Sequence, residues 1–194
     1  MIILISKEIV EKIDATIKNT WINNIQKDYN SLSLLKEDSV KCSFYYHLRR
    51  KLASLLDANS LRIYPEYYIK ELGYRADLAI VKVDFETEKD YLKDMISDVV
   101  AVIEIKFASG NSERSEKWIK SYLSKIKNYV KYNSDFQLYF ASIYETECDH
   151  LRWFDKRSTN NWADGHVVEL SAGYINGKMK FEVHSYNHLN PKLY

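Results

Sequence analysis

The chain has 194 residues, of which 46% are apolar and 28% are charged, a balance typical of a globular protein. Its 28 basic and 27 acidic side chains nearly cancel, so a nucleic-acid partner would need a local basic surface rather than a global positive field. Two cysteines, Cys42 and Cys148, are too few for a secreted disulfide scaffold and too far apart for a zinc site. We expect a single domain over residues 1–194 in a reducing cytoplasm.

The first residues do not indicate a membrane partner. The apolar opening MIILIS is short and is followed at once by Lys7 and Glu8, which argues against a signal peptide or a membrane span.

Helices are then expected over about 7–56. Apolar residues that recur every four positions predict a helix over 7–29: Ile9, Ile13, Ile17, Trp21 and Ile25. A second stripe predicts a helix over about 36–56: Val40, Phe44, Leu48, Leu52 and Leu55.

Strands are expected to follow these helices. Alternating or apolar runs predict strands over four ranges: 61–69, 74–83, 99–107 and 136–143. The first of them contains Pro65, which suits an edge strand because proline cannot donate a backbone hydrogen bond. A strongly periodic stretch predicts a helix over 113–132, between the third and fourth strands.

The C-terminal part is expected to form a β-hairpin within about 166–185. The dipeptide Asn176-Gly177 is a strong signal for a tight turn, and it lies between extended runs at 166–171 and 178–185. The order of helices and strands is typical of an α/β or α+β domain, with a central mixed sheet flanked by helices.

The strand over 99–107 carries two charges in an apolar run. Residues two apart share a face of a strand, so Glu104 and Lys106 share theirs with Val100 and Val102. The opposite face takes Ala101, Ile103, Ile105 and Phe107. Because both faces are largely apolar, we expect the strand to be covered on both sides, with its charges gathered toward its C-terminal end. A buried carboxylate there needs a cation beside it.

Asp77 is expected to meet these charges. If the strands over 74–83 and 99–107 pair antiparallel, a register with Asp77 opposite Glu104 also places Val81 opposite Val100. Two acids and a lysine then converge at one end of the sheet. Carboxylate oxygens suit Mg²⁺ or Mn²⁺, and a neighbouring lysine can orient a water molecule or stabilise developing charge. The set therefore indicates a hydrolytic site.

The segments "YRADLAIV" and "VVAVIEIKFA" resemble the PD-(D/E)XK nuclease superfamily, which has the restriction-endonuclease-like fold. The order of elements is also similar over about 36–144. The resemblance implies that Asp77 and Glu104 bind Mg²⁺ or Mn²⁺ together with the carbonyl of Ile105, and that Lys106 is catalytic. It further implies a catalytic acid on the preceding helix that helps to bind the metal, for which Glu37 is the best match and Asp38 the rival.

Two features depart from the family pattern. Ala76 stands where the motif has proline. Some branches carry Gln-x-x-x-Tyr on the helix after the core lysine, and Lys125 and Tyr129 occupy that spacing here.

The basic surfaces of the helices expected over 113–132 and over about 36–56 also suit contact with a phosphate backbone. The residues expected in such contact are Lys117, Lys120, Lys125, Tyr129, Arg49 and Arg50.

The resemblance implies a metal-dependent nuclease that hydrolyses phosphodiester bonds. DNA is the first expected substrate and RNA the alternative, in restriction, repair or mobile-element defence. Double-strand cutting requires two active sites, which would favour a homodimer. The sequence leaves other interpretations open: an inactive nuclease-like module that binds a nucleic acid or a protein, or an ion cluster that only stabilises the sheet. Glu66 is either an additional ligand or a surface acid.

Overall fold

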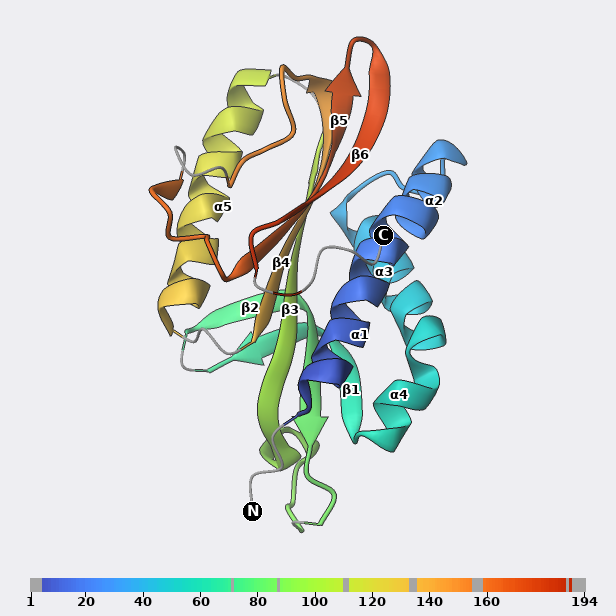
Figure 1. Cartoon of the computed structure of the whole chain (residues 1–194), viewed down its shortest axis with the longest axis vertical. Helices are drawn as coiled ribbons and strands as arrows, with labels where there is room; N and C mark the ends of the chain where they lie inside the picture. The colour runs from blue at the N-terminus through green and yellow to red at the C-terminus, as the bar shows by residue number, and fades with distance from the viewer. Residues whose placement is uncertain are drawn as a thin grey trace.

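The computed structural model describes residues 5–70, 72–86, 88–109, 112–132, 136–154, 159–187 and 189, with the side chains of 112–120 left out. A six-stranded sheet runs through the molecule with helices on both faces (Figure 1). The helices are α1 (Lys7–Asn19), a π-helical segment η1 (Thr20–Ile25), α2 (Gln26–Asn30), α3 (Glu37–Lys51), α4 (Ala53–Ala58), a 3₁₀ turn η2 (Leu92–Met95) and α5 (Ser112–Tyr132). The strands are β1 (Leu61–Ile69), β2 (Tyr74–Val83), β3 (Ile96–Ala108), β4 (Gln137–Glu147), β5 (Val167–Ile175) and β6 (Lys178–Ser185).

The strands lie in the order β1-β2-β3-β4-β5-β6. Strands β1, β2 and β3 pair antiparallel, β3, β4 and β5 pair parallel, and β5 pairs antiparallel with β6. This confirms the α/β class with a mixed sheet flanked by helices. Strand β1 is an edge strand, as Pro65 predicted. None of the helices in the described part of the chain combines the length and the apolar character needed to cross a membrane.

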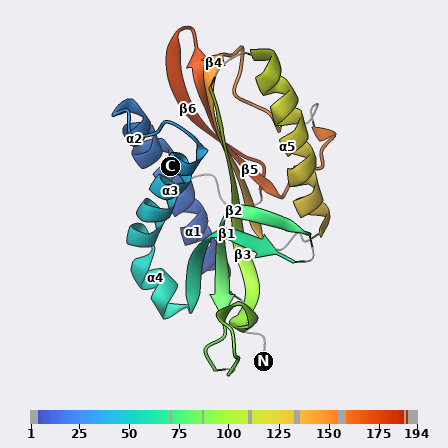
Figure 2. The same cartoon turned by 180° about the vertical axis from the view of Figure 1, so that it is seen from behind.

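Two apolar cores cover the two faces of the sheet. On one face, α1, η1, α3 and α4 contribute side chains such as Trp21 and Phe44, which stack on each other and pack with Ile103 of β3. On the other face, α5 contributes Ile126 and Tyr129. The opposite placement of α5 and the N-terminal helices is clear when the molecule is turned (Figure 2). Strand β3 is therefore covered on both sides, as its sequence predicted.

Both expected N-terminal helices are interrupted. An α-helix turns about 100° per residue, so a stripe that repeats every four residues drifts by about 40° at each step. The π-helical segment η1 has more residues per turn than an α-helix, so it compensates for this drift. Trp21 and Ile25, which lie within it, therefore stay on the buried side of the helix. The second helix breaks at Leu52, whose backbone (φ −98°, ψ 2°) leaves the helical region before α4 begins.

The antiparallel register of β2 and β3 is correct near the charges and wrong farther along. Leu78 pairs with Ile103, in the register that sets Asp77 opposite Glu104. An irregularity after Ile80 then pairs Val81 with Val99 instead of Val100. As a consequence, Val100 packs in the core beneath the N-terminal helices and does not share the face of Glu104.

The C-terminal hairpin is confirmed. Asn176 and Gly177 have φ values of 52° and 70°, the left-handed pair that a two-residue turn between twisted strands requires. Strand β5 is longer than predicted, because Ala172 to Ile175 continue its pairing with β6.

A buried ion pair fixes α1 against the sheet. Lys18 Nζ lies 2.7 Å from Asp14 Oδ2, and the two side chains are 0% and 3% exposed. The hydroxyl of Tyr139 on β4 donates to Asp14 Oδ1 at 2.8 Å. Because a buried charge that loses its partner is strongly destabilising, this pair should contribute to the stability of the whole helical layer.

Substitution Asp14→Asn should lower the free energy of unfolding by about 3 kcal/mol, since it removes the charge that pairs with the buried ammonium group of Lys18. Urea denaturation measures the loss. The matched control is Glu11→Gln on the same helix, where the side chain is 33% exposed and lies 3.7 Å from Lys7; its effect should stay below about 0.5 kcal/mol. Equal effects of the two substitutions would contradict this role of the pair.

Candidate functional site

Asp77 is held where β2 and β3 part. The last cross-strand pair at this end joins Leu78 to Ile103. Beyond it, Asp77 Oδ2 accepts a hydrogen bond from the backbone N–H of Ile105 at 2.7 Å. The carboxylate thus takes the place of a strand partner for that amide. This contact fixes the side chain of Asp77 beside the strand that carries Glu104.

Glu104 is fully buried, and both of its carboxylate oxygens have partners on α5. The hydroxyl of Tyr129 donates to Oε1 at 2.7 Å, and Lys125 Nζ donates to Oε2 at 2.7 Å. Residues four apart lie on one face of a helix, so α5 presents both donors together. Lys125 Nζ also donates to the carbonyl oxygen of Arg75 on β2 at 3.1 Å.

Burial raises the pKa of Glu104 to about 7; Lys125 opposes the shift, and the nearby charge of Asp77 adds to it. Burial and the charge of Glu104 also raise the pKa of Tyr129, which keeps its hydroxyl protonated as a donor. The ionised form of Glu104 is therefore costly to bury, and the ammonium group of Lys125 offsets part of this cost.

Lys106 lies on the same side of β3 as Glu104, as strand parity predicted. Its ammonium group pairs with Glu37 Oε2 at 2.7 Å and lies 4.3 Å from the ring centroid of Tyr122 on α5. Burial opposes the positive charge, but the contacts with Glu37 and Tyr122 outweigh it, so the pKa of Lys106 is raised. The ammonium form is thus secured at neutral pH.

The first turn of α3 brings Glu37 to this cluster. Its neighbour Asp38, the rival candidate, instead points to Lys36 and Lys41 at 3.5 Å each and is 65% exposed. Of the two adjacent acids, Glu37 is therefore the one that reaches Lys106.

The sequence did not single out Lys41 as a site residue. It follows Glu37 by one helical turn, and its Nζ lies 3.7 Å from Asp77 Oδ1. It also pairs with Glu66 of β1. Glu66 has a left-handed backbone (φ 52°) and has no paired residue on β2, because the pairing passes from Pro65 directly to Tyr67. The spacing from Glu37 on one helix face was the signal that could have revealed Lys41.

Not every expected nucleic-acid contact fits the structure. Tyr129 is fully buried, so contact of this residue with a nucleic acid is wrong, and its hydroxyl serves Glu104 instead. Arg49 and Arg50 are exposed but lie at the far end of α3, about 18 Å along the helix axis from Glu37. The side chains of Lys117 and Lys120 lie outside the described residues.

The donor set suits a hard divalent cation bound by few protein ligands. Among the described residues, no three His, Cys, Asp or Glu side chains gather as a metal site. Mg²⁺, however, is commonly held by one or two carboxylates and completes its shell with water and substrate phosphate. Asp77 and Glu104 provide two such carboxylates on adjacent strands, and burial raises the pKa of Glu104.

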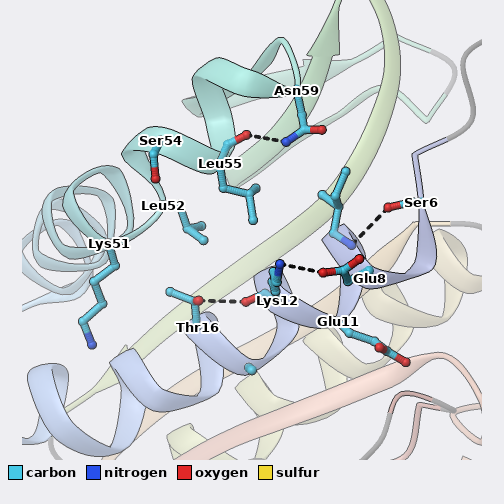
Figure 3. Close-up of a pocket in the computed structure, with 12 residues that line it drawn as sticks. Ser6, Glu8, Glu11, Lys12, Thr16, Lys51, Leu52, Ser54, Leu55 and Asn59 are labelled. Carbon is cyan, nitrogen blue, oxygen red and sulfur yellow. Dashed lines mark hydrogen bonds and ion pairs between the residues drawn. The ribbon is translucent and has the colours of Figure 1, made fainter.

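A separate pocket lies between α1 and the segment from the end of α3 through α4 (Figure 3). Its polar groups largely satisfy one another: Lys12 Nζ pairs with Glu8 at 2.7 Å, and Asn59 donates to the carbonyl of Leu55 at 2.8 Å. Because Asp77, Glu104 and Lys106 do not line it, we do not assign the site chemistry to this pocket.

Comparison of the chain with protein-family models, curated proteins and solved structures gives no match. The candidate site therefore stands on its own geometry.

Glu104→Gln should change how stability depends on pH in the metal-free protein. The folded pKa of Glu104, about 7, exceeds its ordinary value of 4.5, so the folded state of the wild type loses stability as pH rises between these values. The variant does not lose this stability, because glutamine does not ionise. Relative to wild type, it should gain about 2 to 3 kcal/mol in free energy of unfolding between pH 5 and pH 8.

Urea denaturation in the presence of EDTA measures this difference. Glu88→Gln, which alters an exposed carboxylate, serves as the control and should leave the pH profile unchanged. Parallel pH profiles for wild type and Glu104→Gln would show that burial does not perturb Glu104 as described.

Proposed function

We propose that this protein is a metal-dependent nuclease of the PD-(D/E)XK type that hydrolyses phosphodiester bonds in DNA. The observation that carries the proposal is the convergence of Asp77 and Glu104 where β2 and β3 part, with Lys106 on the same side of β3. Two hard carboxylates and a charged lysine are the groups that metal-assisted phosphodiester hydrolysis uses.

The arrangement around the site supports a restriction-endonuclease-like core. Helix α3 precedes three antiparallel strands, and α5 then connects β3 to the parallel strand β4. The acid expected on the first of these helices, Glu37, contacts the expected catalytic lysine. Each of these features agrees with the family to which the sequence motifs are similar.

Asp77 and Glu104 would hold Mg²⁺ or Mn²⁺, with the carbonyl of Ile105 as a further ligand. When bound, the ion would supply Lewis acidity, polarising the scissile phosphate and acidifying a water molecule. The ordered contact between Asp77 and the Ile105 amide positions one carboxylate, and the hydroxyl of Tyr129 positions the other.

Lys106 would orient the attacking water and stabilise the negative charge that develops on the phosphate. Glu37 keeps the ammonium charged and fixes its direction. Because the pKa of Lys106 is raised, this residue acts as a hydrogen-bond donor and a fixed positive charge rather than as a proton acceptor.

RNA is the alternative substrate, and a homodimer would supply the two sites needed to cut both strands.

One observation favours the alternative of an inactive nuclease-like module. Both carboxylates already have an ammonium group beside them, Lys125 at 2.7 Å from Glu104 and Lys41 at 3.7 Å from Asp77. Such a cluster could stabilise the fold without an ion. Calorimetric titration with Mn²⁺ separates the two functions, because a module of this kind need not bind the metal.

Purified protein should cleave plasmid or linear DNA in the presence of Mg²⁺ or Mn²⁺. Glu104→Ala and Asp77→Asn should reduce the rate at least about 100-fold, since each removes a metal ligand. Lys106→Met should cause a loss of about 100-fold by removing a donor to the transition state. Gel electrophoresis of the products measures the rates, with an RNA of the same sequence as the second substrate.

Asp98→Asn is the matched control for these substitutions, because Asp98 is an exposed acid at the opposite end of β3. It should retain the wild-type cleavage rate. Cleavage by Glu104→Ala at the rate of the wild type would defeat the proposal.

A further inference from the structure

We infer that Lys125 is an internal counter-ion that occupies Glu104 until a divalent cation displaces it, and that it thereby sets the metal affinity of the site. This inference rests on the proposed function, because it assumes that Glu104 is a metal ligand. It assigns a specific role to a lysine whose ammonium group contacts the most deeply buried carboxylate of the site.

The two oxygens of Glu104 are not equally accessible. Oε1 accepts from Tyr129, which is fully buried in the core beneath α5. Oε2 accepts from Lys125, whose side chain is 24% exposed. A buried aromatic ring cannot leave without opening the core, whereas a lysine chain has several rotatable bonds and reaches solvent. An incoming ion therefore gains access to Oε2 by replacing the ammonium group.

Lys125 is held at this place by more than the carboxylate. Its Nζ also donates to the carbonyl oxygen of Arg75, two residues before Asp77. The ammonium group thus bridges β2 and β3 at the point where the two acids meet. A divalent cation between Asp77 and Glu104 would lie close to this positive charge, and the two cations would repel each other.

Among the lysines whose side chains are described, the others at the site do not occupy a proposed ligand in the same way. Lys41 lies 3.7 Å from Asp77 Oδ1 and is shared with Glu66, so its contact with Asp77 is looser. Lys106 pairs with Glu37. Lys125 is therefore the lysine whose removal should change metal binding most strongly.

Mn²⁺ binding measured by isothermal titration calorimetry tests the inference directly. The titrations are made at pH 8 without nucleic acid, so that protonation of Glu104, whose pKa is raised to about 7, competes little with the metal. Lys125→Gln should bind Mn²⁺ about fivefold more tightly than wild type, or better, because the competing positive charge is gone. Lys125→Met is the second variant, in case the first does not fold, and thermal melting checks both.

Three control variants separate charge competition from a structural role. Lys125→Arg keeps the positive charge and should retain an affinity near that of wild type. Lys127→Gln removes the same charge from an exposed position on α5 and should not alter the affinity. Tyr129→Phe removes the other donor to Glu104 without a change of charge and should not increase the affinity.

The outcomes distinguish this inference from the proposed function. If wild type binds Mn²⁺ and cleaves DNA, but Lys125→Gln and Lys125→Met bind Mn²⁺ no more tightly than wild type, the counter-ion role is wrong and the nuclease function stands. A purely structural role of Lys125 gives that result together with a lower melting temperature. If wild type neither binds Mn²⁺ nor cleaves nucleic acid, the proposed function fails, and this inference fails with it.

Discussion

The fully buried carboxylate of Glu104 is the constraint on which the site depends. A charge on β3, between two apolar layers, is tolerated only with donors on both of its oxygens. Helix α5 supplies these donors from one face, through Tyr129 and Lys125. These two donors share the face of α5 that also packs Ile126 against the sheet. The buried charge of Glu104 explains why an apolar layer contains a lysine and a tyrosine hydroxyl at this point.

The divergence of β2 and β3 gives the site its second acid. Where the ladder ends, Asp77 pairs with the Ile105 amide and so remains beside Glu104 instead of turning to solvent. Helix α3 then closes the cluster from another direction, with Glu37 and Lys41 one turn apart. Among the described side chains, the carboxylates of Glu37, Glu66, Asp77 and Glu104 pair with three ammonium groups, because Lys41 serves both Glu66 and Asp77. Carboxylates gathered in this way favour a cation at the site over an anion.

Much of this arrangement could be predicted because it depends on short-range patterns. Strand parity placed Glu104 and Lys106 on one side, and the apolar runs predicted that both faces of β3 are covered. The resemblance directed attention to Glu37 as a metal ligand and to Lys125 and Tyr129 as nucleic-acid contacts, but it did not predict that Glu37 pairs with Lys106 or that the two α5 residues pair with Glu104. The role of Lys41 could not be predicted in this way, because it depends on how α3 lies against the sheet. The irregularity after Ile80 carries no glycine or proline signal, so the position of Val100 was also missed.

The central claim is that Asp77 and Glu104 together bind a divalent cation. The most direct measurement is diffraction from crystals soaked in Mn²⁺, with anomalous scattering used to locate the ion. We predict an anomalous peak within coordination distance of both carboxylates, with the ammonium group of Lys125 moved away from Glu104. Crystals that take up Mn²⁺ elsewhere, and keep the Lys125–Glu104 ion pair intact, would contradict the central claim.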